Sequence, residues 1–329
     1  MLSVTTAEWR LFMKEYTYSV ARIRAKEVSL LSESDIEQLL SAQGYEQALA
    51  LLRDKGYDTN GDDISLIDTA EDMTRQFLCE IADEDILKVL HLPIDYHNVK
   101  AAIKAVYTGI TPDGLMLNGG TVDNELIYTS IKSREYSRLE PSLAKTAEEA
   151  MTLLLRTQDG QLCDVMIDRD MLSACEEAAM ETQDSFLIQY RKLCTDTANL
   201  KTALRCAITD KQISFIREAL SDGGTLNVDA LGETAERGKD ALYEYVLQTS
   251  FADGVEYMKK SAAEFEKWCD DRIMALMNEA KFDSFSSAPI VAYSYAKSAE
   301  HSAVKLILSA KRNGLDENLI RERVRRLYV

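Results

Sequence analysis

The three histidines are the residues whose type and spacing could bind a catalytic metal, because helical di-metal centres use Glu-x-x-His pairs on facing helices. They are His91, His97 and His301. None of them has a glutamate three positions before it, and the zinc-protease spacing His-Glu-x-x-His is absent from the chain. The sequence therefore predicts no metal centre of either kind.

A phosphate-binding loop is the second chemistry that the chain approaches. The segment Gly232–Asp240 places five residues between its two glycines where the phosphate loop has four, and Asp240 stands where Ser or Thr would hold magnesium. Glu233 and Glu236 within this segment would repel phosphate. We predict that the segment is the surface start of a helix, and we expect no nucleotide or other cofactor.

Carboxylates and thiols are the remaining candidate catalytic groups. Asp83, Glu84 and Asp85 form an acidic cluster, but the helix dipole favours acidic residues at a helix start without any catalytic role. The six cysteines are widely spaced, without a C-x-x-C pair, and none lies in a context that would activate a thiol. They are predicted to be reduced, mostly buried thiols. No catalytic residue is predicted.

The composition predicts the elements that carry these side chains. The 329 residues include 4 prolines and 14 glycines, whereas average usage would give roughly 16 and 23. This shortage of turn-forming residues argues against sandwiches and barrels, and 46% hydrophobic residues suffice for a real core. We therefore expect an all-α protein of long helices joined by few, short connections.

The charge distribution limits the partners of the chain. A net charge of −17 disfavours nonspecific binding to nucleic acid or to anionic lipid. However, residues 297–329 carry eight basic and four acidic side chains, so this tail either folds back onto the acidic body or attracts an electrostatic partner. The longest uncharged stretch, Ser284–Ala296, has 13 residues, whereas a transmembrane helix needs about 20. No segment is expected to enter the bilayer.

A long-period repeat is the most informative feature of the sequence. Residues 95–107, 196–208 and 300–312 align without gaps, at offsets of 101 and 104 residues. Each copy carries apolar side chains at the helical spacing i, i+3, i+4. The first apolar positions are Val99, Leu200 and Val304. We expect these three side chains to be buried at equivalent places.

Glycines recur with the same period. The sequence Gly-Gly-Thr occurs at 119–121 and at 223–225. After the third copy the match is weaker, with the single glycine Gly314. These glycines are expected to end the repeated helices in the left-handed conformation. The period predicts three similar helical domains, residues 1–118, 119–222 and 223–329, around a pseudo-threefold axis.

Local signals predict where helices begin and end. Ser34 and Glu37 have the spacing of a capping box, and Asp95 and Asp196 are predicted N-caps of the repeated helices. The four prolines are predicted to precede or separate helices rather than to interrupt them. Loops are expected near residues 58–62, 111–120, 157–161, 221–232 and 283–288.

Three lysines are candidate partner-binding residues, because Lys100, Lys201 and Lys305 occupy equivalent positions in the repeat. They either form a threefold ring of positive charge that lines a central opening, or they are ordinary helix lysines that are solvated or belong to local ion pairs. We favour the second interpretation.

Four arginines near the C-terminus are the other candidates. They lie in a terminal helical pattern with Ile320, Val324 and Leu327. The arginines are Arg321, Arg323, Arg325 and Arg326. We expect the apolar side chains to dock while the arginines face an acidic neighbour, in this chain or in another.

Motifs along the chain resemble the C subunit of bacterial and archaeal V-type (A-type) ATPases, which is the counterpart of the eukaryotic d subunit. They comprise residues 16–25, 92–102, 196–205 and 289–329. Because several motifs occur in the same order over nearly the whole chain, the resemblance is specific. One departure is Ala303 in the third repeat, where the family usually has asparagine.

The resemblance implies an all-helical, funnel-shaped protein on the cytoplasmic face of the membrane. It implies a non-catalytic rotor protein that links the central shaft, subunits D and F, to the membrane rotor ring of c/K subunits. In that position the protein transmits rotation for ATP-coupled proton or sodium transport. No cofactor and no nucleic-acid partner is implied.

Two other functions stay compatible with the residues alone. A generic helical scaffold that binds some other protein would share every compositional feature. An enzyme could use a carboxylate or cysteine site that no motif marks. A helical solenoid is less compatible, because its repeats of about 33–47 residues are not found here.

Overall fold

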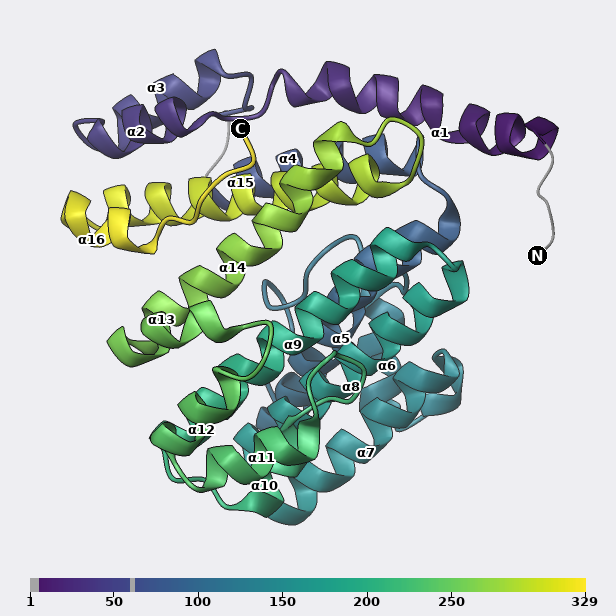
Figure 1. The fold of residues 1–329 in the computed structure, drawn as a ribbon, viewed down its shortest axis with the longest axis vertical. Coiled ribbons are helices and arrows are strands. Elements are labelled where there is room, and N and C mark those ends of the chain that lie inside the picture. Colours follow the sequence, from purple (N-terminus) through teal and green to yellow (C-terminus); the bar gives the residue numbers. More distant parts are fainter. Residues whose placement is uncertain (1–5, 60–62) are drawn as a thin grey trace. The chain divides into compact units, whose positions relative to one another are not determined.

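A computed structural model describes the backbone of residues 6–59 and 63–329, and the side chains from residue 16 onward apart from 60–64 (Figure 1). Within these ranges every regular element is a helix, with sixteen α-helices and three single turns of 3₁₀ helix. The prediction of an all-α protein is confirmed. No helix in the described part of the chain is both long and apolar enough to cross a bilayer.

The chain divides into two compact units. One is formed by residues 1–84 together with 270–329, and the other by residues 85–269. In the first unit, the N-terminal segment therefore packs with the C-terminal segment, although the two lie far apart in the sequence. The division into three domains at residues 118 and 222 stays a prediction.

The first unit is built around one long helix, α15 (Ala288–Arg312). The other helices of this unit are α1 (Thr6–Glu27), α2 (Glu33–Ser41), α3 (Tyr45–Asp54), α4 (Asp63–Cys79) and α16 (Glu317–Arg323), together with the part of α14 from residue 270 onward. The helix α15 contacts α1, α3, α4 and α16 (Figure 1). Val304 and Leu308 of α15 lie in the hydrophobic core of the first unit, together with Leu40 and Leu52. A helix from the C-terminal part of the sequence thus organises the N-terminal helices.

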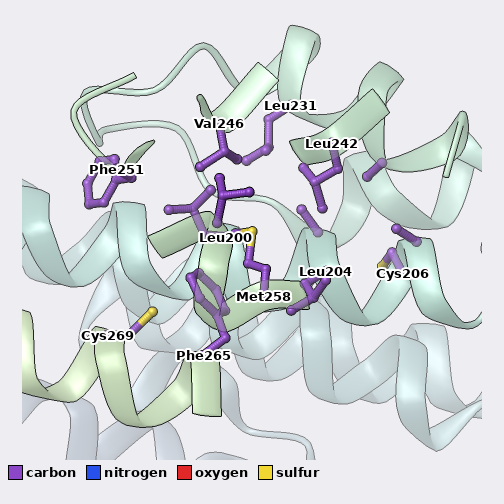
Figure 2. Close-up of a cluster of buried hydrophobic side chains, with 14 of the residues drawn as sticks. Leu200, Leu204, Cys206, Leu231, Leu242, Val246, Phe251, Met258, Phe265 and Cys269 are labelled. Carbon is purple, nitrogen blue, oxygen red and sulfur yellow. The ribbon is translucent and has the colours of Figure 1, made fainter. Parts of the chain in front are cut away.

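The second unit has α9 (Ser185–Ile208) at its centre. Its other helices are α5 (Glu84–Thr108), α6 (Asn124–Ser133), α7 (Pro141–Thr157), α8 (Gly160–Thr182), α10 (Ile213–Ala219), α11 (Val228–Glu236), α12 (Lys239–Val246) and α13 (Val255–Lys260), and α14 (Ala262–Glu279) begins in it. Leu200 on α9 is fully buried among Leu231, Val246 and Phe265 (Figure 2).

The repeated apolar positions are buried as predicted. Val99 and Leu200 are fully buried, and Val304 is 1% exposed. Because each lies within a long helix, the i, i+3, i+4 stripe predicted both the helix and the side of it that faces a core. The thiol prediction is also confirmed: none of the cysteines forms a disulfide, and most of them are buried.

The predictions for the capping box and for the prolines are wrong. The capping box at the start of α2 is formed by Ser32 and Asp35, two residues before the predicted pair of Ser34 and Glu37. The Asp35 carboxylate accepts from the Ser32 amide at 2.9 Å. The shorter side chain of Asp35 therefore bonds the N-cap amide, which was the role predicted for Glu37. Pro93 lies inside α5, where its missing N–H costs one helical hydrogen bond.

The predicted loops are mostly confirmed. Residues 111–120 are not helical, but α8 begins already at Gly160 and α11 at Val228, so the loops predicted at 157–161 and 221–232 are shorter than expected. Of the first predicted loop, residues 60–62 lie outside the described part of the chain.

Candidate functional site

Asp95 lies inside α5 and is 1% exposed, so it is not the N-cap that its sequence context predicted. Its carboxylate accepts hydrogen bonds from the Thr121 amide (3.1 Å), the Thr121 hydroxyl (2.5 Å) and the Val122 amide (3.1 Å). Burial raises the pKa of Asp95, and these three hydrogen bonds oppose the shift. We call this arrangement, in which a buried helix carboxylate holds a distant loop, a carboxylate clamp.

Asp196 forms a second carboxylate clamp at the equivalent position of α9. It is also 1% exposed and lies within the helix, whose N-cap is Asp184 instead. Its carboxylate accepts from the Thr225 amide at 2.8 Å, the Thr225 hydroxyl at 2.7 Å and the Leu226 amide at 3.1 Å. The same donors in the same order show that the repeat extends from helices to a tertiary contact.

An asparagine one turn further along each helix adds a second attachment. Asn98 donates to the Leu117 carbonyl at 2.9 Å and accepts from the Leu117 amide at 2.8 Å. Asn199 makes the same two-way pair with Ser221, at 2.7 and 2.9 Å. The side-chain amide thus bonds both the N–H and the C=O of one loop residue. It satisfies backbone groups that have no partner in a strand or helix, and it fixes the loop to the helix.

The repeated glycines serve these clamps rather than the ends of the repeated helices. A Cβ atom on Gly120 would lie 2.1 Å from a carboxylate oxygen of Asp95, and one on Gly224 would lie 2.1 Å from a carboxylate oxygen of Asp196. The prediction that Gly-Gly ends the repeated helices is therefore wrong for the first two copies. It holds for Gly314, which follows α15 with φ +64°.

We expect Gly224→Ala to lower the free energy of unfolding by about 1–3 kcal/mol, because its Cβ would push the Asp196 carboxylate away from the amides it binds. Chemical denaturation of the two chains measures the difference. Gly160→Ala is the matched control, since a Cβ there meets nothing within 4 Å. Equal losses in both variants would contradict a role of Gly224 in the clamp.

The third copy of the repeat uses its carboxylate differently. Glu300 of α15 is 1% exposed and accepts from the Leu31 amide at 2.7 Å, the Tyr57 hydroxyl at 2.6 Å and the Lys297 ammonium at 2.7 Å. Ala303 replaces the asparagine, so the second attachment is absent. The third carboxylate clamp therefore holds the N-terminal segment of the chain instead of the loop that follows its helix.

His301, beside Glu300, predicts a pH dependence of stability. It is 3% exposed, and burial together with the Lys297 charge lowers its pKa to about 4 from an ordinary value of 6.5. The unfolded chain then binds the proton first as the pH falls. The free energy of unfolding should therefore decrease between about pH 6.5 and pH 4, by up to about 3 kcal/mol.

Denaturation at pH 7 and pH 4.5 tests this expectation. His301→Gln should reduce the difference between the two pH values, whereas the exposed His97→Gln should keep it. If both variants retain the full pH dependence of the parent chain, His301 is not its source.

The three candidate lysines lie in different surroundings. Lys100 on α5 pairs with Asp168 on α8 at 2.5 Å. Lys201 on α9 is half-buried, and Lys305 on α15 is exposed. Lys100 and Lys201 belong to the second unit and Lys305 to the first. A role of these three lysines in binding a partner stays a prediction.

The basic tail folds back onto its own unit. The helix α16 ends at Arg323, earlier than the predicted helical pattern, yet Ile320 and Leu327 are buried as expected. The Val329 carbonyl accepts from the Glu33 amide at 3.2 Å, and the Tyr328 hydroxyl donates to Glu27 at 3.0 Å. The tail thus closes over the N-terminal helices.

Three of the four tail arginines have acidic partners in the first unit. The pairs are Arg321 with Glu37 and Glu317, Arg325 with Asp270 at 2.8 Å, and Arg326 with Glu33 at 4.0 Å. Arg323 is exposed and pairs with no acidic side chain in the described part of the chain. Their role in binding a partner stays a prediction.

A family assignment follows from the match of nearly the whole chain. Residues 19–323 match the family model of the ATP synthase (C/AC39) subunit. The chain belongs to this family. It is 21% identical to the C subunit of the V-type sodium ATPase of Enterococcus hirae, over 93% of this chain and 97% of the relative. It is also 21% identical to the C subunit of the A-type ATP synthase of Thermococcus kodakarensis, over 93% of this chain and 89% of the relative.

The assignment confirms the family resemblance that the motifs indicated. All three carboxylate clamps lie within the matched range. The sequence did contain a signal for the first two clamps, because the helix aspartates recur together with Gly-Gly-Thr. No such signal pointed to Leu31 and Tyr57 as the partners of Glu300, because neither residue belongs to the repeat.

Proposed function

We propose that this chain is the non-catalytic protein that joins the central shaft to the membrane rotor ring of a rotary ATPase. In this proposal subunits D and F form the shaft, c/K subunits form the ring, and the chain lies on the cytoplasmic face of the membrane. The observation that carries the proposal is the family match from residue 19 to residue 323. The coupled ion is a proton or sodium.

The internal contacts support a mechanical role. An adaptor that transmits rotation must resist deformation, and loops are ordinarily the most mobile parts of a protein. Here buried carboxylates hold loops to helices at Asp95 and Asp196, and Glu300 holds the N-terminal segment. Because interiors are closely packed, such attachments transmit force rather than absorb it.

Exposed apolar side chains support contacts with other proteins. Val28 is 87% exposed and Phe282 is 89% exposed, in two segments that Arg24 connects by donating to the Lys281 carbonyl. Both side chains are available for contact with another protein. A generic scaffold would share this feature, so the choice of the rotary ATPase rests on the family match.

The test is association of the purified full chain with subunits D and F of the same organism. We expect the three proteins to elute together in size-exclusion chromatography, and we expect the isolated chain to hydrolyse no ATP. An unrelated acidic, all-helical protein of similar size serves as the control. Robust ATP hydrolysis by the isolated chain would overturn the proposal. So would the absence of any association with either the shaft or the ring.

A further inference from the structure

A groove in the first unit is bordered by three of the tail arginines. It has a volume of about 290 Å³ and lies between α14, α15 and the C-terminal tail. Its charged lining consists of Arg323, Arg325, Arg326 and Asp270. The rest of the lining is apolar or hydroxyl-bearing, and it comes mainly from the middle of α15.

The groove carries a surplus of positive charge. Asp270 pairs with Arg325 at 2.8 Å and neutralises it. Arg326 has Glu33 only at 4.0 Å, and Arg323 has no acidic partner among the described residues. Two guanidinium groups therefore border the groove with little or no compensation, on a chain whose net charge is −17. Such a site attracts carboxylate or phosphate groups.

The wall formed by α15 suits another helix. Ser298, Ala299, Ser302 and Ala303 line it, and Leu306 continues it one turn further on. Small side chains on one face let a second helix approach closely, because the distance between packed helices depends on the side chains at the contact. Met274 and Val324 add apolar surface at the sides.

A phosphate ligand fits this groove less well than a carboxylate-bearing helix. Phosphate sites are commonly built from glycine-rich loops and helix N-termini, whose amides point at the anion. No glycine lines the groove, and the residues of α15 that do, from Tyr295 to Leu306, lie well inside a helix that begins at Ala288.

We infer that this groove receives an acidic amphipathic helix of a protein partner. Carboxylates of that helix pair with Arg323 and Arg326, and its apolar side packs on the small residues of α15. The inference goes beyond the proposed function, because it follows from the charge and shape of the groove and does not require a protein of the shaft or the ring.

The test uses the full chain and a synthetic helical peptide of about 18 residues, roughly 27 Å long. The peptide carries leucines on one face and glutamates beside them, and a second peptide has glutamine at every glutamate. Fluorescence anisotropy of labelled peptide reports binding. We expect the acidic peptide to bind at least tenfold more tightly than its glutamine counterpart, and more weakly at high salt.

Two variants place the binding in the groove. Arg323→Glu reverses its uncompensated charge and Ser302→Trp fills its wall, and each should weaken binding of the acidic peptide at least tenfold. Arg53→Glu makes the same charge change at an exposed site outside the groove and should leave binding unchanged. Circular dichroism confirms that each variant is folded.

Three results would overturn the inference. The first is equal binding of the two peptides, or no binding of either. The second is an equal effect of Arg323→Glu and Arg53→Glu. The third is displacement of the peptide by inorganic phosphate beyond that by sodium chloride of equal ionic strength, which would assign the groove to phosphate anions.

Discussion

Leu200→Asp is expected to lower the free energy of unfolding by about 4 kcal/mol or more. The leucine is fully buried, so its removal costs about 2–5 kcal/mol in lost burial and packing. The aspartate would also place an unpaired carboxylate among apolar side chains. Since small domains are commonly stable by about 5–15 kcal/mol, the variant should melt far below the parent chain in circular dichroism.

Matched variants test whether the three repeated positions are equivalent in the fold. Val99→Asp and Val304→Asp replace the equivalent buried residues and should have effects of the same order. Leu155→Asp is the control, because Leu155 lies on α7 and is 47% exposed. Unchanged melting temperatures in all three core variants would show that the alignment of the three segments is wrong.

Glu300→Ala is expected to lower the free energy of unfolding by about 3–5 kcal/mol. The substitution removes the acceptor for the Leu31 amide, the Tyr57 hydroxyl and the Lys297 ammonium. Glu300 is 1% exposed, so water does not replace the lost hydrogen bonds easily. Removing one partner of a buried charged network leaves the others without compensation. Hydrogen exchange of the Leu31 amide should accelerate more than exchange in α9.

Two controls separate this effect from a simple loss of charge. Glu322→Ala removes one carboxylate from an exposed position of α16 and should change stability by at most about 0.5 kcal/mol. Glu300→Gln keeps an acceptor and should fall between the parent chain and Glu300→Ala. If Glu300→Ala and Glu322→Ala are equally stable, the third clamp does not hold the N-terminal segment.

The comparison of Asp95 with Val99 shows where reasoning from sequence succeeded and where it failed. The burial of Val99 follows from a spacing of three and four residues, which is a property of one helix. Asp95 has the residue type of an N-cap and was predicted as one. Its partner Thr121 is 26 residues away, and a propensity for capping contains no information about a donor at that distance.

Pro93 and Arg321 illustrate the same limit. From its residue type Pro93 is predicted to precede or separate helices, but it lies inside α5, where the contacts along the helix outweigh the missing hydrogen bond. For the basic tail, the sequence left open whether the arginines bind this chain or another. The structure pairs Arg321 with Glu37, which lies 284 residues earlier.

The sequence by itself determined the helical class, the buried stripes and membership of the ATPase family, because periodicity and ordered motifs are local or linear properties of a chain. Only the tertiary structure decided that Glu300 holds Leu31, 269 residues away. A buried carboxylate needs hydrogen-bond donors, but any segment that folding brings near it supplies them equally well. The identity of the donor therefore depends on which segments pack together, and not on the residues that surround the carboxylate in sequence.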